Sequence, residues 1–199
     1  MQKEAAIQIL LDAANYFEHQ GAGYKSWGKV EVIQIAIRLH DNEILITDKN
    51  IPLAALTTND IKDGKNHPVF QRIFAKRKNI QVVLLTKQEF ASKVKTEIPP
   101  ILDDQAQLLG VSIRIARTEN DILHALCGRY ASICADGYNI CIGNTIEEAY
   151  VAAQLLEKTS RAFIEAEYLG GAKSINKIEA WLMHKFYQLK YSKEAKKNK

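Results

Sequence analysis

The chain has 199 residues, of which 47% are hydrophobic and 25% are charged, a composition typical of a globular protein and unlike that of a disordered or collagen-like one. Its formal net charge is +4, but the segment 185–199 alone carries six lysines and one glutamate, so the rest of the chain is close to neutral. This distribution argues against a folded nucleic-acid-binding face. The length predicts a single domain over residues 1–191, followed by a basic, disordered tail over 192–199.

The first part of the chain predicts a helix and then a β-hairpin. Apolar side chains recur at helical spacing over 3–19, and at every second residue over 30–39 and 43–47. The two strands flank a turn at Asp41-Asn42. A change of phase within the longer strand predicts either a β-bulge or a strand that is covered on both faces.

A polar, loop-rich stretch at 51–66 separates the hairpin from a short second helix. Pro68 suits the first turn of this helix, which we expect to end near Arg77. Its predicted N-cap residue is Asn66 or His67.

The second part of the chain alternates between buried strands and helices. The predicted strands are 80–85, 111–116, 129–135 and 138–142. The predicted helices are 87–94, 119–126, 146–169 and 175–191. Thr145 and Glu148 fit a capping box at the start of the long helix, and Asp103 and Asp104 are expected to cap a helix start at QAQLL. The pattern predicts an α/β (α/β/α) fold with a mostly antiparallel central sheet flanked by helices.

The cysteines and the apolar runs give a prediction of location. No apolar run approaches the roughly 18–20 residues of a membrane span, and the start of the chain is typical of a helix rather than a signal peptide. Cys127, Cys134 and Cys141 are odd in number and lack the spacing of a metal site. We therefore expect buried free thiols in a cytoplasmic protein.

Four stretches, in this order, resemble the class II aldolase/adducin family: IAIRLHDNEILIT, IFAKRKNIQVVLLTKQEFA, IPPILDDQAQLLG and DGYNICIGNTIEEAYVAAQLLEK. The resemblance extends from residue 33 to about 191, and its strongest part is the GNTIEEA entry into a long helix. It implies the fold of that family and a homotetramer or other homo-oligomer with sites between subunits. Family members cleave small phosphorylated ketoses with a Zn²⁺ ion on three histidines and a glutamate that moves protons. Such a resemblance implies the fold more securely than the activity.

This sequence lacks the residues that the resemblance assigns to zinc and to proton transfer. Leu85 and Lys87 stand where the family has its His-x-His pair, and Asp136 or Gly137 stands at the third histidine. Asn66 stands at the glutamate, and an amide cannot act as a carboxylate base. Neither leucine nor a protonated lysine binds Zn²⁺. We therefore expect no zinc cofactor and no zinc-dependent aldolase reaction, although Lys87, Asp136 and Asn66 occupy the family's catalytic positions.

The resemblance also assigns two phosphate-binding motifs. The family's Asn-x-Ser-x-Arg corresponds to the run from Gln34 to Arg38, and its Thr-Pro-Thr-Gly corresponds to the run from Thr47 to Asn50. The predicted ligand-binding residues are Gln34, Thr47, Lys49 and Asn50, because a turn rich in donors suits an anion. The alternative for Lys49 is a polar hairpin loop. Arg38 is expected to form a local salt bridge or to face a neighbouring subunit.

Lys87 has three interpretations. In the first, it pairs with Asp136 and the ion pair fills the vacated metal site. In the second, it is a desolvated nucleophile that forms a Schiff base with a carbonyl substrate. In the third, it is a solvated lysine at the end of a strand.

These observations leave three functions open. The first is a protein that has lost the zinc-dependent site and binds a small anionic or carbonyl ligand between subunits. The second is an aldolase-type carbon–carbon lyase with altered chemistry based on Lys87, aided by Asp136 or Tyr187. The third is an oligomeric scaffold, as the resemblance to adducins implies. Trp181, Met183, Phe186 and Tyr187 crowd the last helix and cannot all be buried on one stripe, so this helix suits a contact between subunits. The expected partners are further copies of the chain and a small anionic ligand, with no membrane and no nucleic acid.

Overall fold

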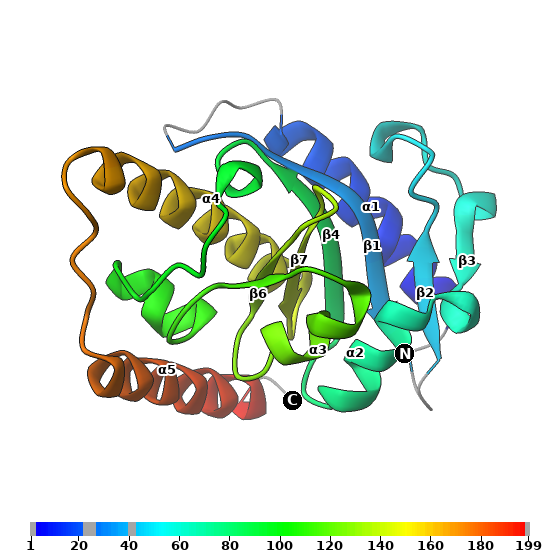
Figure 1. Ribbon diagram of the computed structural model, residues 1–199. Helices are drawn as coiled ribbons and strands as arrows, with labels where there is room; N and C mark the ends of the chain where they lie inside the picture. Colours follow the sequence, from blue (N-terminus) through cyan, green and yellow to red (C-terminus); the bar gives the residue numbers. More distant parts are fainter. Residues whose placement is uncertain (1–2, 22–26, 40–42, 198–199) are drawn as a thin grey trace.

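The structure, a computed structural model, describes residues 3–21, 27–39 and 43–197 (Figure 1). Within these residues, a seven-stranded sheet has the order β3-β2-β1-β4-β7-β6-β5. All neighbouring pairs are antiparallel except β5 and β6, which are parallel. The strands are β1 (Val30–Arg38), β2 (Ile44–Thr47), β3 (Ile61–Asp63), β4 (Val82–Gln88), β5 (Arg114–Ala116), β6 (Ala131–Cys134) and β7 (Asn139–Gly143).

Helices cover both faces of this sheet, as Figure 1 shows. Helices α1 (Lys3–Gly21) and α4 (Ile146–Tyr168) pack against one face, and α2 (Pro68–Lys76) and α3 (Ile122–Ala125) lie over the other. The predicted α/β class with a mostly antiparallel sheet is therefore confirmed.

The core lies around the three central strands. Ile35 on β1, Leu84 on β4 and Ile142 on β7 are completely buried. Because helices cover both faces here, these strands are apolar on both sides rather than strictly alternating. A register shift between Val32 and Gln34 also places a bulge in β1. The irregular alternation of apolar residues in β1 therefore has both predicted causes, a β-bulge and burial of both faces.

The start of α2 and the start of α4 are capped much as the sequence predicts. His67, rather than Asn66, caps α2, because its Nδ1 accepts the Phe70 N–H at 3.5 Å. Thr145 Oγ1 accepts the Glu148 N–H at 3.1 Å, and the Glu148 carboxylate accepts the Asn144 N–H at 2.6 Å. These bonds satisfy N–H groups that a helix start leaves unpaired.

The helix predicted over 87–94 is wrong. Strand β4 continues to Gln88, and a single 3₁₀ turn (Ala91–Lys93) follows it. The cause is non-local: the buried Glu157 carboxylate of α4 accepts the N–H groups of Phe90 and Ala91 at 2.9–3.0 Å. A local pattern cannot reveal a carboxylate that lies 66 residues further along the chain.

Three other segments differ in length or type from their predictions. QAQLL forms a π-helical turn (Gln105–Leu109), and Asp104 caps it by accepting the Gln105 N–H at 2.9 Å. The predicted strand 111–116 is reduced to β5, and the predicted helix 119–126 becomes a 3₁₀ turn (Glu119–Asp121) followed by α3.

The last helix, α5 (Lys177–Lys197), packs beside the QAQLL turn and extends past its predicted end at residue 191. The division into a domain and a disordered tail stays a prediction. The turn predicted at Asp41-Asn42 lies outside the described residues.

The cysteines differ in burial. Cys141 is buried, Cys134 is half-buried, and Cys127 is exposed, so the expectation of three buried thiols is wrong for Cys127. Burial raises the pKa of Cys134 and of Cys141 to about 12, which leaves both as inert thiols. Across the described residues, we find no helix with the length and hydropathy that a membrane crossing requires.

Candidate functional site

The sheet face that carries α2 and α3 bears the predicted site residues Gln34 and Lys87. Gln34 on β1 lies opposite Leu85 on β4, and Glu31 lies opposite Lys87. Directly paired residues project from the same face of a sheet, as do residues two apart on one strand. Gln34, Leu85 and Lys87 therefore share one face.

Lys87 is exposed on this face and contacts an aromatic ring. Its Nζ lies 4.9 Å from the centroid of the Tyr138 ring, a cation–π contact that contributes about 0.5–1 kcal/mol at an exposed site. It has no ion pair within 4.0 Å with any described residue, so the predicted pair with Asp136 is not formed. Asp136 is itself exposed in the turn between β6 and β7, where its Oδ1 accepts the Tyr138 N–H at 3.2 Å.

The side chains at the three zinc positions do not fit a zinc ion. Leu85 has no donor atom, Lys87 presents an ammonium group, and a protonated amine is not a ligand. Asp136 is in an exposed turn, and its neighbour Gly137 has no side chain. No cluster of three or more His, Cys, Asp or Glu side chains that could hold a metal occurs among the described residues.

Gln34 and Thr47 form a buried polar link between β1 and β2. The Gln34 Nε2 donates to the Thr47 carbonyl at 2.7 Å, and the Thr47 Oγ1 accepts the Ile35 N–H at 3.0 Å. The Gln34 Oε1 is buried and has no hydrogen-bond partner within the described structure. An unpaired buried acceptor costs about 1–3 kcal/mol, and in native proteins such atoms mark places where a ligand or water donates.

Lys49 and Asn50 lie in the turn that follows Thr47. The donors of Asn50 are hydrogen-bonded within this turn, whereas the ammonium group of Lys49 has no ion pair with the described residues. The Asn50 N–H and Nδ2 both donate to Asp48 Oδ1, at 3.0 and 3.1 Å. Asp48 also pairs with Lys62, which is the main reason that its pKa is lowered. Lys49 is exposed and has no ion pair with the described residues, so it supplies a cation at this edge.

His67 is a site candidate that the sequence identified only as a helix cap. Its ring stacks on Phe70 with centroids 3.8 Å apart, and burial is the main cause of its lowered pKa. The charge of Lys49 lowers the pKa further, whereas that of Glu119 raises it. A neutral ring whose Nδ1 accepts this backbone N–H would carry its proton on Nε2 and be a donor there. In the sequence, the one indication of a site role for His67 is that it directly follows Asn66, which stands at the family's proton-transfer position.

Asn66 does not cap α2, and Arg38 contacts the other end of the same helix. Asn66 is exposed at the end of a 3₁₀ turn (Gly64–Asn66). Arg38 donates to the carbonyls of Phe74 at 2.6 Å, Arg77 at 2.9 Å and Ile80 at 3.1 Å. It therefore stabilises the carbonyl end of α2, as cations do at helix C-termini, and forms no salt bridge with the described residues. The predicted subunit contact of Arg38 stays a prediction.

Comparison with solved structures identifies the fold. L-fuculose 1-phosphate aldolase superposes with a TM-score of 0.77 at 15% identity, covering 94% of this chain and 98% of that chain. L-fuculose-1-phosphate aldolase from Thermus thermophilus gives 0.65 at 16% identity, covering 86% of this chain and 100% of that one. An aldolase II superfamily protein from Pseudomonas syringae gives 0.62 at 13% identity, covering 92% and 84%.

The chain therefore has the class II aldolase fold, which confirms what its sequence resembles at the level of fold. No family model matches the sequence, and no curated protein matches it either.

Proposed function

We propose that the protein is a homo-oligomer that binds a small hydroxylated anion at the edge formed by Gln34, Thr47, Lys49 and His67, and that it does so without zinc chemistry. The observation that supports this proposal most directly is the buried Gln34 Oε1, an acceptor without a hydrogen-bond partner in the part of the chain that the structure describes. Gln34 is bonded to Thr47, two residues from the exposed cation of Lys49. A ligand that reached both this acceptor and this cation would combine a hydroxyl group with a negative charge.

A phosphorylated sugar or a hydroxy acid is a ligand of this class. Two of the solved structures with this fold are named as aldolases of L-fuculose 1-phosphate, a hydroxylated anion. This similarity supports the ligand class but not the reaction, because fold and chemistry are separable. Leu85 and Lys87 do not supply the ligand atoms that zinc requires. The cytoplasmic location remains a prediction that the reduced thiols support.

The alternative of a lyase with a Schiff-base lysine has weaker support. A nucleophilic lysine depends on burial or on a neighbouring cation, whereas Lys87 is exposed over the Tyr138 ring. Borohydride reduction in the presence of dihydroxyacetone phosphate should leave the mass of the protein unchanged. A stable adduct on Lys87 would instead favour the lyase.

The ligand proposal is tested by calorimetric titration with three probes: dihydroxyacetone phosphate, uncharged dihydroxyacetone, and inorganic phosphate. We expect the first to bind most tightly, because it alone offers both a hydroxyl group and an anion. Lys49→Gln should weaken its binding about tenfold or more, which is at least about 1.4 kcal/mol. Lys173→Gln, which removes an exposed lysine from the loop between α4 and α5, is the matched control. Equal affinities for the wild type and for Lys49→Gln would contradict the proposal.

A further inference from the structure

Helix α5 presents an apolar stripe that stays exposed among the described residues. Ile178, Leu182 and Leu189 lie at helical spacing on one side of the helix, with Trp181 and Phe186 on its flanks. These five side chains are exposed by 71%, 42%, 57%, 51% and 68% respectively. Monomeric proteins rarely expose contiguous apolar patches of this kind, which mark interaction surfaces.

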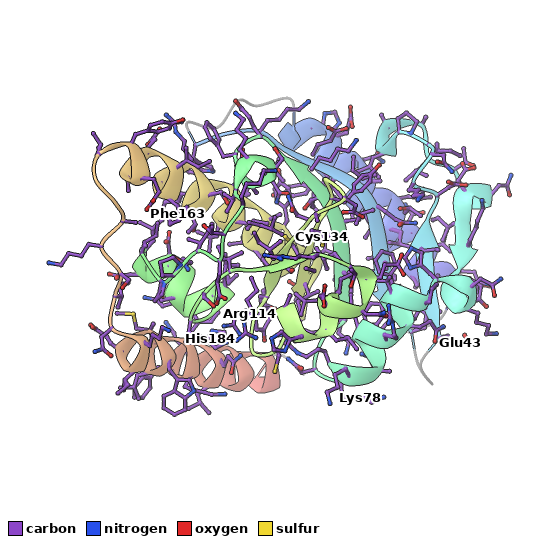
Figure 2. The ribbon with its side chains drawn as sticks, viewed as in Figure 1. Glu43, Lys78, Arg114, Cys134, Phe163 and His184 are labelled. Atoms are coloured by element: carbon purple, nitrogen blue, oxygen red, sulfur yellow. The ribbon has the colours of Figure 1, made fainter. Side chains whose placement is uncertain are left out.

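The stripe faces away from the body of the protein because the opposite side of α5 is already docked. Ala180 and His184 are buried, and the His184 Nδ1 lies 2.8 Å from the Gln107 carbonyl. Figure 2 shows His184 on the inner side of α5, while other side chains project from its outer side. The stripe therefore needs a partner molecule.

A second apolar surface lies between α1 and α4. It is a groove of about 440 Å³, whose floor includes Ile37 and Val82 of the sheet and whose walls include Ile9 of α1 and Ile146 of α4. Its volume is in the range of pockets that hold organic groups. Three exposed apolar side chains on these two helices extend the surface, namely Ile9, Tyr16 and Val151, each 39–46% exposed.

The charges around the two surfaces are opposite. Lys185 lies within the α5 stripe, with Lys177 and Lys190 also exposed on the helix. The groove is lined by the exposed carboxylate of Glu147 on α4, and a second exposed acidic residue, Asp12, lies on α1. Two α5 stripes packed on each other would bring lysines together, whereas a stripe in the groove places them beside carboxylates.

We infer that the α5 stripe of one copy docks in the α1–α4 groove of a second copy of this chain. The inference rests on the proposed homo-oligomer and specifies the two surfaces that form its contact. The groove is distinct from the Gln34 and Lys49 edge, because its floor residues Ile37 and Val82 project from the α1–α4 face of the sheet, whereas Gln34 projects from the opposite face. Ligand titration tests the ligand site and self-association tests the subunit contact. Because the two surfaces are distinct, a negative result for one proposal can be told apart from a negative result for the other.

The experiment uses two complementary defects in the full chain. Leu182→Glu/Leu189→Glu disables the stripe and leaves the groove intact, whereas Ile9→Glu/Val151→Glu disables the groove and leaves the stripe intact. Leu169→Glu is the matched control, because Leu169 is 89% exposed and lies outside both surfaces. Circular dichroism verifies that each variant is folded, and light scattering after size exclusion gives the mass.

We expect the wild type and Leu169→Glu to assemble, and each double variant to be monomeric alone. An equimolar mixture of the two double variants should form a one-to-one dimer, since one intact stripe meets one intact groove. A monomeric wild type, a groove variant that assembles like the wild type, or a mixture that stays monomeric would each overturn the inference. If Ile9→Glu/Val151→Glu fails to fold, Glu147→Lys replaces it; that change should weaken assembly, and adding Lys185→Glu should restore it. Loss without restoration would also overturn the inference.

Discussion

The two faces of the sheet around β1 and β4 differ in how completely their buried polar groups are hydrogen-bonded. Towards α4, Gln88 Oε1 accepts from Asn139 Nδ2 at 2.7 Å and from Thr86 Oγ1 at 3.0 Å, and Gln88 Nε2 donates to the Ala153 carbonyl at 3.2 Å. Towards α2, the buried Gln34 keeps an acceptor that no described group pairs, and Lys87 is exposed. Buried polar groups that are fully satisfied stabilise a fold, whereas unsatisfied ones cost stability unless a water or a ligand pairs them.

The largest effect is expected at Glu157, which lies on the satisfied side. Its buried carboxylate holds the N–H groups of Phe90 and Ala91, and Glu157→Ala leaves both unpaired. We expect the free energy of unfolding to fall by about 3–5 kcal/mol, because two buried N–H groups lose their acceptor and the packing of the side chain is lost as well. Urea denaturation measures it. Glu165→Ala on the exposed side of α4 is the control and should cost less than about 1 kcal/mol.

A matched pair of glutamine substitutions tests the comparison itself. Gln88→Met leaves the Asn139 amide without its acceptor, so we expect a loss of about 2–3 kcal/mol in the free energy of unfolding. Gln34→Met loses one bond to Thr47 but also removes an unpaired acceptor, and should cost about 1 kcal/mol or less. In return, Gln34→Met should weaken dihydroxyacetone phosphate binding about tenfold. Equal stability losses, with binding unchanged, would remove the distinction between the two faces.

The pH dependence of stability is expected to be smaller and to come in part from His184. Burial is the main cause of its lowered pKa, so the unfolded chain binds a proton more readily than the folded one. The stabilisation is therefore fully present above the unfolded pKa of about 6.5 and is lost as the pH falls through the range below it. His184→Asn should flatten this part of the curve of unfolding free energy against pH. An unchanged slope in the variant would contradict the assignment.

The smallest effect is expected at Lys87. Lys87→Gln removes an exposed cation–π contact with Tyr138 and should change the free energy of unfolding by no more than about 1 kcal/mol. Ligand binding should stay within about twofold of the wild type in the same titration, because the proposal gives Lys87 no contact with the ligand. A large loss of binding would restore Lys87 as a site residue.

Most of the architecture could be predicted from the sequence because it depends on local periodicity and caps. The antiparallel pairing of β1 with β2 and the Thr145 cap of the long helix follow from signals of this kind, and both are confirmed. The 3₁₀ turn after β4 could not be predicted, since it depends on Glu157 from a distant helix. The site was harder for the same reason. The resemblance to a family identified Gln34 and Thr47 as candidate site residues. Only the fold reveals that Gln34 Oε1 is unpaired, that the Asn50 Nδ2 donates to Asp48, and that Lys87 lies over the ring of Tyr138.

The central claim is that this fold carries a ligand site without zinc. The most direct measurement is the metal content of tag-free protein by mass spectrometry, after expression with zinc supplied. Because neither Leu85 nor Lys87 provides a ligand atom, the account predicts less than about one tenth of a zinc ion per chain. A stoichiometric zinc ion that survives dialysis would contradict the account.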